Sequence, residues 1–134
     1  MNVVLSSRAK GEGEGRGAVW CGSLEEAMRV LEGMSVDDDD DVEEGAVKVG
    51  RVFIIGGRAV YKAALERPET KRVLLTRVYG DWDCDVFFPA DIEHEKGWER
   101  KGLKEFRDWV GEEVPEGRVK EGEVEFEYCM FERD

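Results

Sequence analysis

An apolar run, two glycines and a helical pattern follow one another without a gap in residues 52–68, VFIIGGRAVYKAALERP. The run 51–55 predicts a strand that is buried on both faces, as the strands of parallel sheets are. A helix is expected over 58–66, and RVLLTRV at 72–78 predicts the next buried strand. Together the three segments predict a right-handed β-α-β crossover and therefore an α/β protein.

Gly56 and Gly57 stand at the carboxyl end of the first strand and open the helix. Open α/β sheets bind ligands at this place, and a missing side chain lets a ligand approach the main chain closely. The start of a helix adds unpaired N–H groups and a partial positive charge, which suit a phosphate or pyrophosphate. A tight strand-to-helix turn without a ligand explains the two glycines almost equally well, because the full GxGxxG pattern is absent.

Further elements are expected on both sides of this unit. Strands are predicted at 2–5 and 18–21, and an antiparallel strand at 124–131, with Val124, Phe126, Tyr128 and Met130 on one face. The segment 23–33 predicts a helix, whose apolar face holds Leu24, Ala27, Met28 and Leu31. Ser23 and Glu26 fit a capping box, and Gly33 can supply a left-handed stop. The charged segment 93–122 indicates surface structure with a few core anchors, namely Trp98, Leu103, Phe106, Trp109 and Val110.

Size and charge narrow the class of protein. The 134 residues suit one domain, and the net charge of −12 without an evident basic face argues against a nucleic-acid binder. No apolar run has the length of a membrane span, and no secretory leader is evident. The acidic segment 34–50 is predicted to be a mobile loop, with a metal site or a basic partner as the weaker alternatives. Three cysteines without a CxxC pair favour reduced, buried thiols inside the cell.

Several stretches together resemble the dihydrofolate reductase family, particularly its eukaryotic and fungal members. They are NVVLSS, VFIIGGRAVYKAAL, RVLLTRV, DCDVFFPADI and EFEYCMFERD, in the family's order and approximate spacing. The resemblance implies a mostly parallel, twisted sheet with flanking helices and an antiparallel C-terminal strand, over one partial domain, 1–134. It also implies NADPH as cofactor, 7,8-dihydrofolate as substrate, tetrahydrofolate as product and the cytoplasm as location, with mitochondria left open.

The resemblance also assigns roles to individual residues. The cofactor site would be lined by Ser6, Ser7, Arg8, Ile55, Gly56, Gly57, Arg58, Ala59, Val60 and Tyr61. Tyr61 would lie near the nicotinamide, or else be a core aromatic of the helix, and Thr76 would support the pterin site. Arg58 departs from the small residue common in the family and would either assist or obstruct a diphosphate. Asp85, Phe87, Phe88 and Pro89 match a segment to which no chemistry is assigned, and no metal is expected.

The matched portion is the C-terminal part of the family, because the front strands and helices have no counterpart in these 134 residues. The family's catalytic acid belongs to that front part, so no catalytic residue is assigned; neither Asp81, Asp83 and Asp85 nor His94 is placed to replace it. Strands without their neighbours should be marginal, or be covered by a second copy or a partner protein.

Three hypotheses follow for the function. The chain belongs to a dihydrofolate reductase and is itself inactive, or it is a short paralogue used for cofactor-free cyclisation or isomerisation of a specialised metabolite, or it is a non-catalytic interaction subunit.

Overall fold

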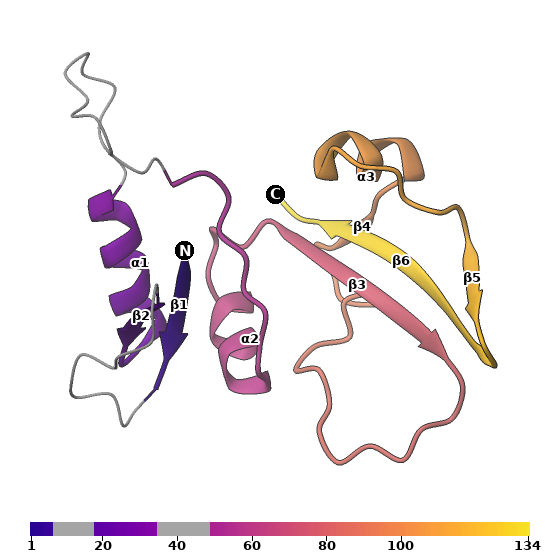
Figure 1. Ribbon diagram of the computed structural model, residues 1–134, viewed down its shortest axis with the longest axis horizontal. Helices are drawn as coiled ribbons and strands as arrows, with labels where there is room; N and C mark the ends of the chain where they lie inside the picture. The colour runs from indigo at the N-terminus through magenta and orange to yellow at the C-terminus, as the bar shows by residue number, and fades with distance from the viewer. Residues whose placement is uncertain (7–17, 35–48) are drawn as a thin grey trace. The chain divides into compact units, whose positions relative to one another are not determined.

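The computed structural model describes residues 1–6, 18–34 and 49–134, which form two compact units (Figure 1). The N-terminal unit is Met1–Gly56 and the C-terminal unit is Gly57–Asp134. The predicted acidic loop over 34–50 lies outside the described residues from 35 to 48. The prediction of one domain over 1–134 stays a prediction.

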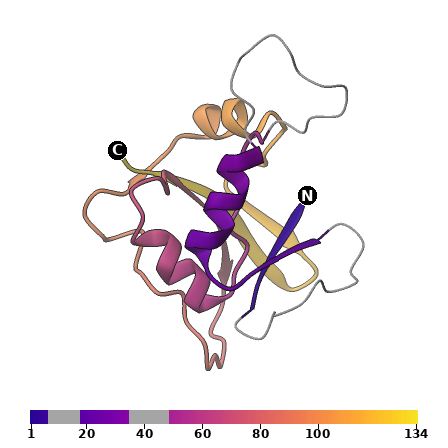
Figure 2. The same cartoon turned by 90° about the vertical axis from the view of Figure 1, so that its left-hand side faces the viewer.

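The N-terminal unit contains two parallel strands and one helix. Strand β1 (Asn2–Leu5) pairs with β2 (Ala18–Cys21), with Asn2 opposite Ala18 and Leu5 opposite Cys21. The N–H of Ser6 donates to the carbonyl of Cys21 at 3.0 Å and extends this ladder. Helix α1 (Leu24–Met34) packs against both strands (Figure 2). The predictions of strands at 2–5 and 18–21 and of the helix that follows are confirmed.

The start of α1 is closed by side chains. The hydroxyl of Ser23 accepts a hydrogen bond from the N–H of Glu26 at 3.1 Å, as a capping box requires. The Glu26 carboxylate accepts a hydrogen bond from the N–H of Gly22 at 2.6 Å. A regular capping box would use the N–H of Ser23, the N-cap residue, instead. The left-handed stop expected at Gly33 is wrong, because the helix continues to Met34 and Gly33 has no positive φ. Glycine permits a left-handed conformation without imposing one.

The C-terminal unit is built on a four-stranded antiparallel sheet. Strand β6 (Val124–Glu132) pairs with β3 (Arg72–Tyr79) along the whole length of β3, with Arg72 opposite Glu132 and Tyr79 opposite Glu125. Strands β4 (Glu99–Arg100) and β5 (Arg118–Glu121) pair with β6 as well. The α/β class and the antiparallel C-terminal strand are thereby confirmed.

Successive side chains of β6 pack on opposite faces of this sheet, as the period of a strand requires. Cys129 and Phe131 cluster with Ile92 on one face, where Val73 and Leu75 of β3 also pack. Met130, on the other face, clusters with Phe106 of α3 (Leu103–Val110) and with Val114. The core anchors expected between 93 and 122 are confirmed in Phe106, with Trp98, Leu103, Trp109 and Val110 packed around the two clusters.

The second face of the sheet is covered only in part. Leu74 and Val78 are each 45% exposed and Tyr128 is 40% exposed, so the expectation that 72–78 is a buried strand is wrong for this face. Alternation of apolar residues shows which side chains share a face, whereas coverage depends on what packs on that face.

The predicted strand 51–55 belongs to neither of the two sheets. Residues 51–57 precede helix α2 (Arg58–Leu65), and Ile55 is 89% exposed. The expected β-α-β crossover is therefore wrong for the described residues, because β3 pairs with β6 in antiparallel fashion. The apolar run indicated a tendency to burial, but a strand also needs a neighbour that supplies the ladder.

Two of the three cysteines are buried. Cys21 and Cys129 are each 2% exposed, and burial raises the pKa of both thiols, which favours the uncharged and unreactive form. The expectation of buried thiols is wrong for Cys84, which is exposed. Free thiols are confirmed for all three residues.

Candidate functional site

The two glycines have different conformational roles. Gly56 has a φ of +115°, which a residue with a side chain rarely adopts, so this position requires glycine. Gly57 has a φ of −83° and is the N-cap residue of α2, a conformation open to any residue. Among the described residues, no atom outside the immediate chain neighbours lies within 4 Å of where a Cβ on Gly57 would stand. The position of such a Cβ is therefore open among the described residues, and the ligand site stays a prediction.

The start of α2 differs from the starts of the other two helices. Ser23 caps α1, and the Glu105 carboxylate accepts from the N–H of Gly102 at 3.1 Å at the start of α3. Within residues 1–6, 18–34 and 49–134, no side chain caps α2, and the first turn of this helix holds no acidic residue. The first N–H groups of a helix have no partner inside the helix, and together with the helix dipole they favour an anion. The start of α2 can therefore accept the negative charge that side chains supply at α1 and α3.

The residues predicted to line the cofactor site fall into three groups. Gly57, Arg58, Ala59, Val60 and Tyr61 form the start of α2; Arg58 and Ala59 are exposed, whereas Val60 and Tyr61 are half-buried. Ile55 and Gly56 directly precede them but belong to the N-terminal unit, as does the half-buried Ser6. Ser7 and Arg8 lie outside the described residues.

Tyr61 packs against an aromatic residue of the segment that follows β3. Its ring centroid lies 5.2 Å from that of Phe88, with the ring planes tilted by 54°. Such an arrangement is favourable between aromatic rings. Tyr61 is half-buried and belongs to neither core cluster, so its role as a core aromatic and its role near the nicotinamide both stay predictions.

The far end of α2 is anchored in the C-terminal unit. Ala64 is buried, and Leu65 packs against the cluster of Ile92, Cys129 and Phe131. The Thr70 hydroxyl donates to the carbonyl of Ala64 at 2.5 Å. The helix is thus fixed at its C-terminal end and presents its exposed first turn away from this anchor.

Thr76, the predicted support of the pterin site, lies in β3 opposite Tyr128 of β6. Thr76 is exposed and lies on the face of the sheet that also carries Leu74 and Val78. The structure therefore places Thr76 in the same unit as the start of α2, on an accessible face of the sheet.

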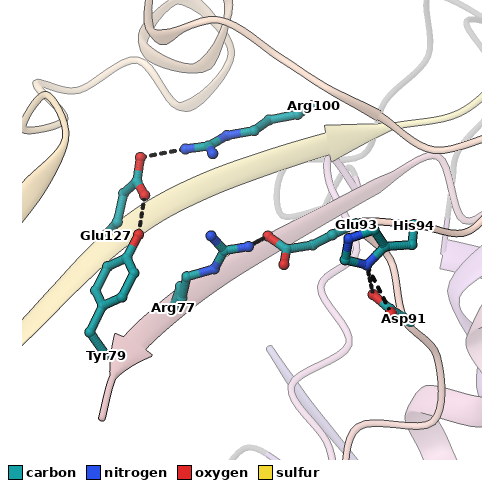
Figure 3. A network of polar contacts seen from close by, with 7 residues as sticks. All are labelled: Arg77, Tyr79, Asp91, Glu93, His94, Arg100 and Glu127. Atoms are coloured by element: carbon teal, nitrogen blue, oxygen red, sulfur yellow. Dashed lines mark hydrogen bonds and ion pairs between the residues drawn. The ribbon is translucent and has the colours of Figure 1, made fainter.

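A network of charged groups lies on the C-terminal sheet (Figure 3). The Tyr79 hydroxyl donates to one oxygen of Glu127 at 2.7 Å, and Arg100 donates to the other. Arg77 forms an ion pair with Glu93 farther along β3. Strands β3, β6 and β4 supply the groups around Glu127, so this part of the network joins the three strands.

The central carboxylate of this network, Glu127, is held in its charged form. The hydrogen bond from Tyr79 lowers the pKa of Glu127, burial opposes the shift, and Arg100 and Arg77 add to it. Glu127 is therefore ionised at neutral pH and is unsuited to donate a proton. His94 lies at the edge of the network, 79% exposed, with its Nδ1 2.9 Å from Asp91. Asp81, Asp83 and Asp85 are exposed as well.

Within residues 1–6, 18–34 and 49–134, no three or more His, Cys, Asp or Glu residues gather in a way that could hold a metal ion. None of the helices in the same ranges is long and apolar enough to cross a membrane.

Comparison with known proteins gives matches along the whole chain. The sequence model of the family described as dihydrofolate reductase matches residues 1–108. The dihydrofolate reductase of Pneumocystis carinii is 38% identical over 94 residues, which cover 68% of this chain and 46% of that protein. The dihydrofolate reductase of Drosophila melanogaster is 29% identical over 134 residues, 99% of this chain and 61% of that protein. The chain thus spans about half the length of these curated relatives.

The fold agrees with a solved structure of the same family. Schistosoma mansoni dihydrofolate reductase superimposes with a TM-score of 0.68 at 24% identity, covering 99% of this chain and 62% of that chain. The family's sequence model covers most of the chain, and the fold of the solved structure extends over nearly all of it. This chain belongs to the dihydrofolate reductase family.

Proposed function

We propose that this chain supplies the dinucleotide-binding part of a dihydrofolate reductase, which uses NADPH to reduce 7,8-dihydrofolate to tetrahydrofolate in one-carbon metabolism. The observation that carries the proposal is the uncapped start of α2 directly after Gly56 and Gly57. Membership of the family supports it, as do relatives that are themselves named dihydrofolate reductase.

The residues at the start of α2 fit an anionic cofactor. The N–H groups of Arg58, Ala59 and Val60 belong to the first turn, which no side chain of the described residues caps. The exposed Arg58 adds a positive charge beside them, which favours assistance of a diphosphate over obstruction. Open space at Gly57 lets the ligand approach the main chain. We assign Ile55, Gly56 and Tyr61, with Ser6, Ser7 and Arg8, to the same cofactor.

The chemistry divides between cofactor and protein. NADPH, when bound, supplies the hydride. The protein must bind the pterin and deliver a proton to it, and we assign Thr76 to support of the pterin site. Among the described residues we assign no proton donor, because Glu127 is held ionised and His94 is exposed in a local contact with Asp91.

We further propose that a second copy or a partner protein covers the exposed apolar face of the C-terminal sheet. Leu74, Val78 and Tyr128 lie together there on β3 and β6. Exposed apolar surface of this kind favours association. On the basis of its family, we place the protein in the cytoplasm, with mitochondria as the alternative.

The experiment is a titration of the purified, folded chain with NADPH, followed by addition of dihydrofolate while the absorbance is recorded. We expect saturable binding of NADPH without robust turnover. The variant Gly57→Asp should weaken NADPH binding by roughly a hundredfold, because a carboxylate then occupies the donors offered to phosphate. It should leave the fold intact, since the φ of Gly57 suits any residue.

Ser23→Asp is the matched control, because it places the same charge at the start of α1, which is already capped. It should leave NADPH binding unchanged. Equal affinity of the wild-type chain and Gly57→Asp for NADPH would remove the basis of the proposed site. Robust turnover would show that a proton donor was overlooked.

A further inference from the structure

The guanidinium of Arg133 closes the C-terminal end of α2. Its Nη2 donates to the carbonyls of Leu65 at 2.8 Å and of Arg67 at 2.6 Å, and its Nε donates to the carbonyl of Thr70 at 2.8 Å. Leu65 is the last residue of the helix, and Arg67 and Thr70 belong to the turn that leads on to β3. The last carbonyls of a helix have no partner within it and attract a positive charge.

Arg133 is itself held in place from two sides. Its main-chain N–H donates to the carbonyl of Lys71 at 3.0 Å and continues the pairing of β6 with β3 beyond Glu132. Its guanidinium carbon lies 4.6 Å from the ring centroid of Trp98. An arginine whose planar group is fixed by a strand and an aromatic ring is a defined support for whatever it contacts.

Arg133 supports a short, stiff helix, α2. A helix of eight residues is about 12 Å long, so a tilt at its C-terminal end displaces its first turn. Apart from the contact between Tyr61 and Phe88, the anchors of α2 described above lie at its C-terminal end. The direction of the N–H groups of the first turn therefore depends on how this end is held.

We propose that Arg133 is a positioning residue for the dinucleotide: it fixes the C-terminal end of α2 and so sets the direction of the N–H groups at the helix start. The proposal rests on the proposed function, in which these N–H groups bind the phosphates of NADPH. Arg133 itself does not contact the cofactor in this account, since it lies at the opposite end of the helix.

The experiment compares Arg133→Met with a matched variant elsewhere in the unit. Methionine keeps an unbranched stem near Trp98 but removes all three donors to α2 and its turn. Arg107→Met is the control, because Arg107 donates through two nitrogens to the carbonyl of Val114, at 3.0 and 2.7 Å, in the region of α3. Each variant loses the bonds of an arginine to main-chain carbonyls, and only one of them loses bonds to α2.

Three measurements are made: NADPH affinity and amide hydrogen exchange along α2 on the wild-type chain and both variants, and rescue of binding by added methylguanidinium. Arg133→Met should bind NADPH about tenfold more weakly, as the loss of charged hydrogen bonds predicts, and its α2 amides should exchange faster. The rescue is measured on Arg133→Ala, because methionine fills part of the place that the guanidinium leaves, and methylguanidinium should restore much of the NADPH binding of that variant. Arg107→Met should change neither the NADPH affinity nor the exchange along α2.

The proposal is overturned if Arg133→Met and Arg107→Met bind NADPH equally well, or if methylguanidinium restores nothing. It is also overturned if exchange rises equally in α2, β3 and β6, since that pattern indicates global destabilisation. If the wild-type chain itself fails to bind NADPH, the proposed function fails together with the positioning role. Faster exchange confined to α2 would then still identify Arg133 as the anchor of the helix.

Discussion

Two polar regions of the C-terminal unit differ in how their groups are satisfied. Around Glu127, side chains from three strands neutralise one another: Tyr79 and Arg100 bind its two oxygens. At the start of α2 the polar groups are main-chain N–H groups that no side chain caps. Internal pairing makes the first region a support for the sheet, whereas the second is where we propose that a ligand binds. On that proposal, a site is marked by polar groups left for an outside partner and not by charge alone.

The largest effect is expected from the same substitution at adjacent glycines. Gly56→Ser should lower the free energy of unfolding by about 1–3 kcal/mol, because serine rarely adopts a φ of +115°. Gly57→Ser should change it by only a few tenths of a kcal/mol, since serine is at least as good an N-cap residue as glycine. Denaturant unfolding measures both. Equal losses in the free energy of unfolding at the two positions would contradict the distinct roles assigned to the two glycines.

Glu127→Gln tests the internally paired region, because it removes the charge that Tyr79 and Arg100 bind. It should lower the free energy of unfolding by about 1–2 kcal/mol at neutral pH. The loss is modest because Arg100 is partly exposed. The folded-state pKa of Glu127 lies below the ordinary glutamate value of 4.5. Its contribution is therefore present above that value and is lost as the pH falls through the lower folded pKa. Urea unfolding at several pH values should show this acid-side loss in the wild-type chain and a flatter profile in the variant. Parallel profiles would contradict it.

Ser23→Ala removes the cap that α1 has and α2 lacks. The free energy of unfolding should fall by about 1 kcal/mol, which is typical of a lost N-cap, while NADPH affinity stays unchanged. Thermal unfolding and the NADPH titration check the two parts separately. A loss of NADPH affinity without a loss of stability would mean that the start of α1 also contributes to binding.

The smallest effect is expected at the rim of the charged network. His94→Gln should change the free energy of unfolding by less than about 0.5 kcal/mol, because the pair with Asp91 is largely exposed. NADPH binding should not respond either. A marked loss of stability in urea unfolding, or of affinity in the NADPH titration, would show that this exposed histidine has a role that its position does not suggest.

Much of the local structure could be predicted from single stretches. The helix beginning near Leu24 and the strand 2–5 follow from apolar spacing and, for the helix, from the cap at Ser23. The glycine pair pointed to the start of α2, and the positive φ of Gly56 accounts for one of the two glycines. Arg133 gave no signal of this kind: its partners Leu65, Arg67 and Thr70 are more than 60 residues earlier in the chain.

The amino-acid sequence by itself determined the positions of α1 and α2, the glycine turn and the family, because these depend on neighbouring residues and on motifs in a fixed order. Only the tertiary structure decided that 51–55 joins neither sheet, that β3 pairs with β6, and that Arg133 holds the far end of α2. The physical reason is that strand pairing and long-range hydrogen bonds depend on which distant segments meet. The apolar pattern of one segment records its tendency to be buried and says nothing of its partner.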